Sequence, residues 1–320
     1  MTAPSPAHAA RIAFIDDVRR GLGGSPKRLP SRYFYDELGS QLFEAICQLP
    51  WYPITRAEDR LLGAHAADMI APFPALAEIC ELGCGSGDKI GRLMAALDAR
   101  GEAPTVHLID VSPRAHELAQ SSLSRFPRAR VQSHLGTYEE GLAALPKSPS
   151  GQRLALFLGS NIGNFDPPAA RALLAAIRRA LRPGDGLLLG ADGVRAEADL
   201  VLAYDDPLGV TAAFNKNLLQ RLNAELGADF DLASFAHEAR WNAPASRMEM
   251  HLVSRRAQRV TIPAAEMTAR FHEGESIWTE SSCKYTETMI TDLGLTAGLT
   301  VEARWVDERT HFSTTLFRVR

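Results

Sequence analysis

A glycine loop and an aspartate on successive predicted strands are the first residues whose types and spacing suit chemistry. "ELGCGSGDK" (81–89) places Gly83, Gly85 and Gly87 between an apolar strand and a helix, and the next strand ends at Asp110. Glycines tolerate positive φ and let a ligand approach the backbone, and a helix N-terminus offers unpaired N–H groups. A carboxylate after the second strand suits the paired hydroxyls of a ribose.

Each feature also has a structural explanation, because glycines end turns and an aspartate at a strand end can cap a helix. Together, in one β-α-β unit, they indicate a nucleotide-like ligand. The loop differs from the GxGxxG dinucleotide pattern and lacks the Lys-Ser/Thr of a Walker motif, so it favours S-adenosylmethionine over NAD or ATP. No metal site is expected, because the spacing of Cys80 and Cys84 is not that of a zinc knuckle.

A second polar stretch, "SIWTESSCKYT" (276–286), sets Glu280 among hydroxyls between Trp278 and Cys283. It is too polar for a core strand and too poor in charge for an ordinary solvated loop. One interpretation is that Glu280 faces a ligand. The other is that it pairs with Lys284 or Arg247 at the surface, and the local sequence leaves both open.

Composition limits the class of protein. The 320 residues are 46% apolar, which suits one large domain with a second, smaller one. Thirty-five basic and 38 acidic residues, without a basic run, disfavour nucleic-acid binding. The N-terminus lacks an apolar signal segment and no stretch has membrane-spanning length. With four cysteines that show no disulfide pattern, these features predict a cytoplasmic protein, and the lack of a heptad predicts a monomer.

The elements that must position these residues alternate from residue 76 onward. Apolar strands alternate with helices, which predicts a parallel sheet with helices on both faces. The end of the chain reads as helix, strand, turn and strand, which predicts an antiparallel hairpin on that sheet. The strands are expected at 76–82, 105–112, 130–136, 154–165 and 184–192, with helices at 88–99 and 113–124.

The alternation stops after Asp192 and resumes near residue 284. We therefore predict an α/β methyltransferase domain of residues 57–195 and 284–320, and a smaller α+β substrate-binding lobe of residues 10–56 and 196–283. Within the lobe, 10–22 reads as an amphipathic helix and 247–262 as a hairpin, while residues 1–9 are expected to be disordered.

From Leu29 to Arg320, the chain resembles the histidine-specific methyltransferases of ergothioneine biosynthesis. The resemblance implies a Rossmann-like class I methyltransferase fold. It also implies trimethylation of the α-amine of L-histidine to hercynine, with S-adenosylmethionine consumed and S-adenosylhomocysteine released. The motifs that carry it are "RYFYDELGSQLFEAI", "YPITRAE", "ELGCGSGDK", "LGSNIGNF", "AYDDPLGVTAAFNKN", "FAHEARWN", "RMEMHL" and "TESSCKY".

The resemblance also implies roles for individual residues. Tyr35 would contact the cofactor and steer the amine, which makes it the catalytic candidate; no general base is assigned. Asn164 and Tyr204 would hold the α-carboxylate, and Tyr52 would approach the imidazole. Glu280 and Ser282 would bind the ring nitrogens, beside Met250. The remaining cofactor-binding residues would be Gly83, Lys89, Asp110, Thr137, Tyr138 and Gly159.

Two positions depart from the family pattern. Thr137-Tyr138 stands where the family has an Asp-Phe pair at the adenine, and "YPIT" stands for "YYPT" beside Tyr52. Taken singly, the tyrosines could be interface aromatics, Asn164 a turn cap before Asp166, Met250 core filler and Lys89 a solvated lysine.

Two alternatives remain. One is an N-methyltransferase of this fold for another amino acid such as tryptophan, whose indole N–H also suits Glu280. The other is a non-catalytic module that binds S-adenosylmethionine. The missing basic surface disfavours an RNA methyltransferase.

Overall fold

The computed structural model describes residues 6–146 and 151–320. The chain divides into two compact units, each made of two segments. Unit 1 comprises Met1–Tyr52 and Ala196–Ser282, and unit 2 comprises Pro53–Arg195 and Cys283–Arg320. The ligand-binding roles assigned above to the two parts of the chain remain predictions.

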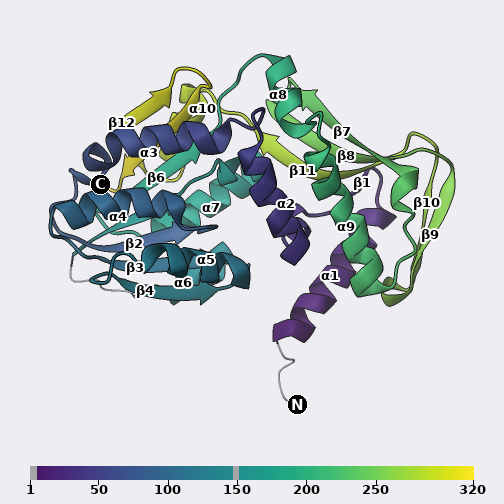
Figure 1. Ribbon diagram of the computed structural model, residues 1–320, viewed down its shortest axis with the longest axis horizontal. Helices are drawn as coiled ribbons and strands as arrows, with labels where there is room; N and C mark the ends of the chain where they lie inside the picture. Colours follow the sequence, from purple (N-terminus) through teal and green to yellow (C-terminus); the bar gives the residue numbers. More distant parts are fainter. Residues whose placement is uncertain (1–5, 147–150) are drawn as a thin grey trace. The chain divides into compact units, whose positions relative to one another are not determined.

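Unit 2 contains a seven-stranded sheet in the order β12-β13-β6-β5-β2-β3-β4 (Figure 1). The strands β2 to β6 pair in parallel, and β13 pairs antiparallel to both β6 and β12. This arrangement confirms the predicted Rossmann-like sheet with its C-terminal hairpin. The strands are β2 (Leu76–Leu82), β3 (Thr105–Asp110), β4 (Arg130–Leu135), β5 (Gln152–Phe157), β6 (Gly186–Ala191), β12 (Thr300–Asp307) and β13 (Phe312–Arg318).

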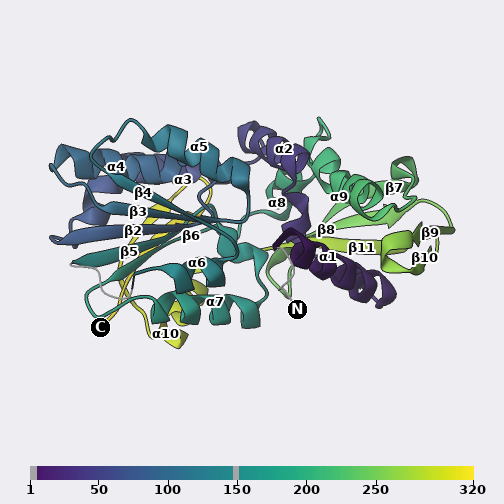
Figure 2. The ribbon, with the colours of Figure 1, turned by 90° about the horizontal axis from the view of Figure 1, so that it is seen from below.

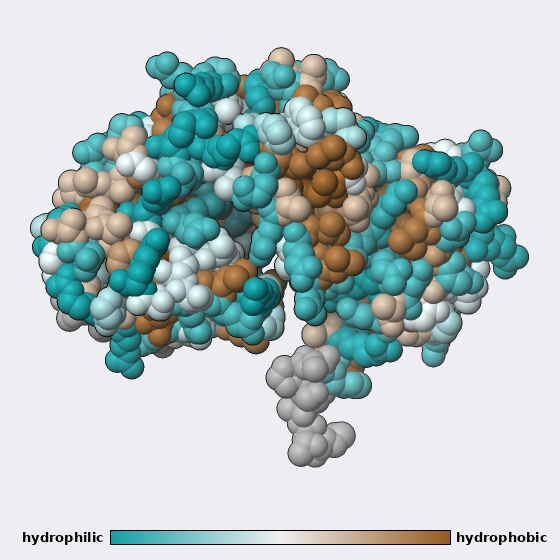
Figure 3. Space-filling model, in the orientation of Figure 1, coloured by the Kyte–Doolittle hydropathy of each residue, from teal (hydrophilic) through white to brown (hydrophobic). Residues whose placement is uncertain are grey.

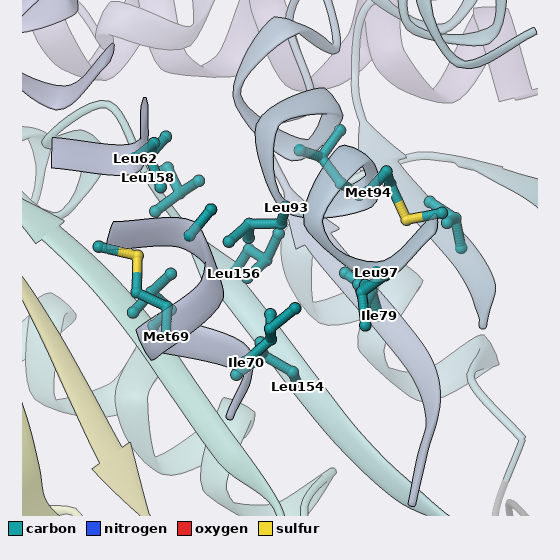
Figure 4. Close-up of a cluster of buried hydrophobic side chains, with 14 of the residues drawn as sticks. Leu62, Met69, Ile70, Ile79, Leu93, Met94, Leu97, Leu154, Leu156 and Leu158 are labelled. Carbon is teal, nitrogen blue, oxygen red and sulfur yellow. The ribbon is translucent and has the colours of Figure 1, made fainter. Parts of the chain in front are cut away.

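Helices cover both faces of this sheet, as Figure 2 shows. One face carries α3 (Ile54–Ile70), α4 (Asp88–Ala99) and α5 (Pro113–Leu123), and the other carries α6 (Tyr138–Ala144), α7 (Pro167–Arg179) and α10 (Glu287–Thr296). The central strands are therefore buried on both sides, which explains why β6 is apolar throughout instead of alternating. Figure 4 shows the core beneath α3 and α4, where Leu62 lies by Leu158, Leu93 by Leu156 and Ile70 by Leu154.

Unit 1 is an α+β structure around a four-stranded sheet in the order β1-β11-β8-β7. Its strands are β1 (Lys27–Arg28), β7 (Phe235–Asn242), β8 (Arg247–Ser254) and β11 (Ser276–Cys283), and a separate pair is formed by β9 (Gln258–Ile262) and β10 (Met267–Phe271).

The helices of unit 1 are α1 (Pro6–Gly23), α2 (Glu37–Gln48), α8 (Glu197–Tyr204) and α9 (Val210–Leu226). Helices α8 and α9 pack on β7 and β8, and α2 packs on α9. Hydrophobic surface is visible over the region of α2 and α9 in Figure 3, and exposed apolar side chains nearby in sequence include Leu38 and Leu208.

Three local expectations differ from the structure. Residues 247–262 do not form a hairpin, because β8 has β7 on one edge and β11 on the other, so β9 pairs with β10 instead. Helix α1 begins at Pro6, since proline and alanine suit a first helical turn; only residues 1–5 of the stretch expected to be disordered lie outside the described residues. The strand expected at 154–165 ends at Phe157, and a 3-10 helix, η2, follows at Asn161–Asn164.

No helix in the two described segments is long and apolar enough to cross a membrane.

Candidate active site

Three of the predicted tyrosines belong to one aromatic cluster in unit 1. Tyr35 lies edge-on to Phe43 and Phe214, with ring centroids 5.6 Å and 5.9 Å away. Phe43 in turn meets Tyr52 at 6.4 Å, and Tyr52 meets Tyr204 at 6.1 Å. The packing of α2 against α9 thus joins the predicted residues Tyr35, Tyr52 and Tyr204, which are far apart in sequence.

The polar stretch of β11 meets this cluster. The Tyr204 hydroxyl donates to Ser282 Oγ at 2.8 Å. Burial raises the pKa of Tyr52 well above its usual value, and the negative charge of Glu280 adds to that effect. Glu280 therefore lies within electrostatic reach of Tyr52. Four predicted substrate residues, Tyr52, Tyr204, Glu280 and Ser282, are gathered at one place in unit 1.

Burial along β11 departs from strict alternation where these residues occur. Ile277 and Thr279 are buried around the half-buried Trp278, but Glu280 and Ser281 are then both half-buried, and Ser282 is buried. A regular strand would send residues 280 and 282 to one face and 281 to the other. This irregularity explains why the stretch fits neither a solvated loop nor a core strand by sequence.

The two basic residues considered as surface partners of Glu280 have other acidic partners. Lys284 lies 2.8 Å from Asp192, and Arg247 lies 2.7 Å from Glu249 and stacks over Trp278. Met250, on β8, is 2% exposed, and its carbonyl accepts from the Thr279 hydroxyl at 2.9 Å. It is core in unit 1, and its contact with a substrate remains a prediction.

The glycine loop of unit 2 has the backbone that a close-lying ligand needs. Gly83, Gly85 and Gly87 have φ values of 78°, 49° and 77°, in the left-handed region. A Cβ on Gly83 would lie 2.8 Å from Asn161 Nδ2 and 3.1 Å from the Tyr138 hydroxyl. The loop, Asn161 and Tyr138 thus converge at the carboxyl end of β2.

Asp110 is fixed beside the loop and is not a helix cap. Its Oδ1 accepts from the Ser112 N–H at 2.9 Å, and its Oδ2 lies 3.5 Å from the Gly85 nitrogen. Ser112, instead, caps α5 through the Ala115 N–H. Burial raises the pKa of Asp110. A half-buried carboxylate held next to a glycine loop fits the hydroxyls of a ribose.

Lys89 is half-buried and forms an ion pair with a buried acid, so it is not a fully solvated lysine. Its Nζ lies 2.8 Å from Glu58, whose side chain is 0% exposed. Both oxygens of Glu58 also accept from the Gly159 N–H, each at 2.9 Å. A Cβ on Gly159 would lie 2.6 Å from the lysine nitrogen. Glu58 therefore holds two of the predicted cofactor residues, Lys89 and Gly159, in fixed relation.

The buried side chain of Glu81, next to the glycine loop, also suits a bound cofactor. It is 1% exposed, and among residues 6–146 and 151–320 its Oε2 has no hydrogen-bond partner. Burial raises its pKa, while the positive charge of Lys89 opposes that rise. An unsatisfied buried carboxyl is costly, and a ligand that brings N–H donors removes the cost. The amino-acid part of S-adenosylmethionine carries such donors.

The departures and alternatives noted in the sequence have local explanations. Thr137 forms a capping box with Glu140 at the start of α6, so its side chain is engaged with the helix. Tyr138 packs edge-on against Phe157, with centroids 5.4 Å apart. Asn164 ends η2, and it is Asp166 that caps α7 by accepting from Ala169 N–H at 2.8 Å. A contact of Thr137 or Tyr138 with adenine, and of Asn164 with substrate, stays a prediction.

None of the four cysteines, Cys47, Cys80, Cys84 and Cys283, is in a disulfide. Within the described segments, no group of three or more His, Cys, Asp or Glu side chains is placed to hold a metal ion.

Gly83→Ala is expected to weaken S-adenosylmethionine binding by about 10-fold or more. The added methyl group meets Asn161 and Tyr138, and the left-handed backbone adds strain of roughly 1–3 kcal/mol. Gly85→Ala is the matched control, because a Cβ there meets nothing within 4 Å. Isothermal titration calorimetry with the cofactor compares the two variants. Equal affinities would contradict the role of this tight corner.

Sequence reasoning overlooked Glu58, Glu81 and Asn161, although all three lie in motifs already quoted. The available signal was an acid inside an apolar pattern: Glu81 interrupts "LAEICELG", and Glu58 lies on the buried face of α3. The hydrogen-bond partner of Glu58 could not be deduced from the sequence, because Gly159 follows it by 101 positions.

Known proteins match this chain over most of its length. The model of the family described as histidine-specific methyltransferase, SAM-dependent, matches residues 14–319. The chain is 40% identical to the histidine N-alpha-methyltransferase of Mycobacterium tuberculosis, covering 96% of this chain and 95% of that protein. It is 35% identical to ergothioneine biosynthesis protein 1 of Neurospora crassa over 63% of this chain and 23% of that protein.

A relative of lower sequence identity is named for a derivative of a different amino acid. The 4-dimethylallyltryptophan N-methyltransferase of Claviceps fusiformis is 27% identical, covering 94% of this chain and 91% of that protein. The family match spans nearly the whole chain and confirms the resemblance carried by the motifs. This protein therefore belongs to the family of histidine-specific, S-adenosylmethionine-dependent methyltransferases.

Proposed function

We propose that this enzyme trimethylates the α-amine of L-histidine to hercynine, the first step of ergothioneine biosynthesis. The observation that carries the proposal is the Glu280 and Ser282 pair beside the buried Tyr52 and Tyr204 in unit 1. A carboxylate accepts from an imidazole N–H, and a serine hydroxyl can donate to or accept from the second ring nitrogen. Histidine is the amino acid whose side chain offers both nitrogens.

The residues of unit 2 fit the cofactor that the family uses. We assign Gly83 and Lys89 to its amino-acid part, on the side of the loop where Glu81 and Glu58 lie. Asp110, half-buried beside Gly85, would accept from the ribose hydroxyls. S-adenosylmethionine supplies a methyl group on a sulfonium, which a neutral amine takes by direct displacement. No protein group needs to form a covalent bond in such a reaction.

The contribution of the protein is then mainly one of position. Holding two reactants in line can supply roughly 7–11 kcal/mol in favourable cases. Glu280 and Ser282 would fix the imidazole, and Tyr35, in the aromatic cluster, is our candidate for orienting the amine. The amine must lose a proton before each transfer, since only its lone pair can attack.

Mass spectrometry of L-histidine incubated with the purified protein and S-adenosylmethionine tests this function. The expected result is a stepwise mass gain that ends at three added methyl groups, with no gain on L-tryptophan. A mass gain on another amino acid but not on histidine would mean that the proposed substrate is wrong and the proposed cofactor is right. No gain on any amino acid would favour a non-catalytic binding module.

The rate at saturating cofactor is expected to rise from about pH 6 to about pH 9. The attacking group is the α-amine of a free amino acid, which is protonated at about pH 6 and whose neutral fraction grows steadily toward about pH 9. Initial rates at fixed total histidine measure the profile. A flat profile over these pH values would show that amine deprotonation does not limit the reaction.

Tryptophan is the alternative substrate that the comparisons support, because one relative is named for a tryptophan derivative. An indole has one N–H and no second ring nitrogen, so it would leave Ser282 without a ring partner. Sites with buried polar groups reject ligands that leave them unpaired. A panel that ranks kcat/KM for histidine, tryptophan and phenylalanine separates the two substrates.

We also propose a cytoplasmic monomer that binds no nucleic acid. The support is the mixed charge of the chain, with 35 basic and 38 acidic residues, and its four cysteines, none of which is in a disulfide. Size-exclusion chromatography with light scattering tests the oligomeric state, and a mass of twice the 34.8 kDa chain would contradict it.

A further inference from the structure

A buried chain of hydrogen bonds in unit 1 links four elements behind the proposed histidine site. The Thr279 hydroxyl on β11 donates to Asn215 Oδ1 on α9, at 2.8 Å. Asn215 Nδ2 lies 2.8 Å from His237 Nδ1 on β7, and His237 Nε2 lies 2.8 Å from the Tyr204 carbonyl at the end of α8. Asn215 and Thr279 are 0% and 1% exposed. We call Thr279, Asn215 and His237 the relay.

Two carbonyl oxygens fix the direction of every hydrogen bond in the relay. Asn215 Nδ2 also donates to the His251 carbonyl at 3.2 Å, and a carbonyl can only accept. The Tyr204 carbonyl likewise requires a proton on His237 Nε2. In a neutral ring Nδ1 then accepts from Asn215, whose oxygen is left for Thr279. The single Thr279 hydrogen is shared between this oxygen and the Met250 carbonyl, which lies 2.9 Å away. At the other end, both hydrogen bonds of the His237 ring form only when the ring is neutral with its proton on Nε2.

The ends of the relay are the elements that carry the proposed substrate residues. Thr279 directly precedes Glu280, and Ser282 follows on the same strand. Tyr204 is the last residue of α8, where carbonyls lack helical partners, and His237 supplies one. The hydroxyl of the same tyrosine contacts Ser282 at 2.8 Å. Any turn of the Tyr204 backbone would move that hydroxyl relative to Glu280.

We propose that His237 is a positioning residue for histidine recognition, acting with Asn215 and Thr279 to hold Tyr204 and Ser282 in register with Glu280. The proposal rests on the proposed function of Glu280 and Ser282. The relay lies within unit 1, whereas the predicted cofactor loop belongs to unit 2, so the relay is expected to act on affinity for the amino acid and not on affinity for S-adenosylmethionine.

The surroundings of His237 favour the neutral ring. Its side chain is 2% exposed and burial lowers its pKa, which Lys216 of α9 lowers further. The carboxylates that oppose this effect are Asp205, with Oδ1 3.9 Å from Nε2, and Asp206. Asp206 is itself engaged with the N–H groups of residues 208, 210 and 211.

The neighbouring strand adds no charge at the relay. On β8, Leu252 lies opposite His237, and the ring of His251 bonds instead to Glu249 and Ser276. Because the folded pKa of His237 is lowered, the relay is intact at neutral pH. It fails as the pH falls below the ordinary histidine value of about 6.5 and the ring takes up a second proton.

The test compares KM for L-histidine and Kd for S-adenosylmethionine in two histidine variants. His237→Leu removes the donor to Tyr204, and the expected result is a KM raised about 10- to 100-fold with the cofactor Kd unchanged. His237→Gln keeps an N–H near the Nε2 position but cannot titrate. Its KM for L-histidine at neutral pH is expected to stay within about threefold of the wild-type value. As the pH falls below about 6.5, its KM should rise less than that of the wild type, because glutamine takes up no proton. His272→Gln, at an exposed histidine, is the matched control.

A second pair of variants covers the case in which His237→Leu does not fold. Thr279→Val keeps the shape but removes the donated hydrogen, and Thr279→Ser restores it. A raised KM in the first and a normal KM in the second support the relay. Unchanged KM in Thr279→Val, or equal weakening of both ligands, would overturn the proposal. Wild-type protein that does not methylate histidine would instead refute the proposed function itself.

Discussion

Glu280→Ala raises KM for L-histidine by about 10- to 150-fold and leaves the Kd for S-adenosylmethionine unchanged. A hydrogen bond to a charged group contributes about 1.5–3 kcal/mol, and each 1.4 kcal/mol is about a tenfold change in affinity. The half-buried carboxylate lies within electrostatic reach of the buried Tyr52, so water replaces it poorly. Steady-state kinetics and calorimetry measure the two constants.

Two further variants show whether the carboxylate itself is responsible. Glu280→Gln keeps an acceptor oxygen and the side-chain volume, so its KM should lie between those of wild type and Glu280→Ala. Glu273→Ala, at an exposed glutamate three residues before β11 begins at Ser276, is the control and should change neither constant. Equal loss of affinity for histidine and cofactor in Glu280→Ala would indicate a folding role for Glu280 instead.

Asp192→Ala lowers the free energy of unfolding by about 3–5 kcal/mol, the cost of leaving a buried charge without its partner. Asp192 and Lys284 are both 0% exposed and lie 2.8 Å apart. Arg195, 8% exposed, contacts the other oxygen of Asp192 at 2.7 Å. Removing the one carboxylate leaves two buried cations, and urea denaturation measures the loss.

The matched control is a surface ion pair of unit 2. Asp59 and Arg92 are 52% and 51% exposed and lie 2.9 Å apart, so Asp59→Ala should cost only about 0–1 kcal/mol. A cost below 1 kcal/mol for Asp192→Ala would mean that Lys284 reaches water in the folded protein.

The position of Asp192 in the chain helps to explain the large loss of stability expected for Asp192→Ala. It joins the segment after β6 to the segment after β11, where the Tyr285 N–H donates to the Asp192 carbonyl at 2.9 Å. Gly193 pairs with Tyr285 in a parallel bridge. Within unit 2, the segments 192–195 and 283–285 are therefore joined both by backbone hydrogen bonding and by an ion pair.

The sequence by itself determined the architecture of the sheet and the kind of ligand. Strands that are apolar throughout, alternating with amphipathic helices, have few other ways to bury their surface. They predicted β2, β3, β4 and β6 closely, whereas β5 ends at Phe157, well before the expected residue 165. The glycines at 83, 85 and 87 indicated the cofactor loop, since local backbone conformation depends on local residue type. The motifs that carry the family resemblance, and with it histidine as substrate, are likewise readable without coordinates.

Tertiary structure alone decided which side chains serve one another. Lys89 looked like a solvated lysine until α3 placed Glu58 beside it, and "RMEMHLVSRRAQRVTI" looked like a hairpin until β11 took the free edge of β8. The relay joins Thr279, Asn215 and His237 across up to 64 positions. Hydrophobic periodicity repeats every few residues and so encodes local elements, whereas a buried hydrogen bond or ion pair depends on the packing of distant elements, which no local pattern specifies.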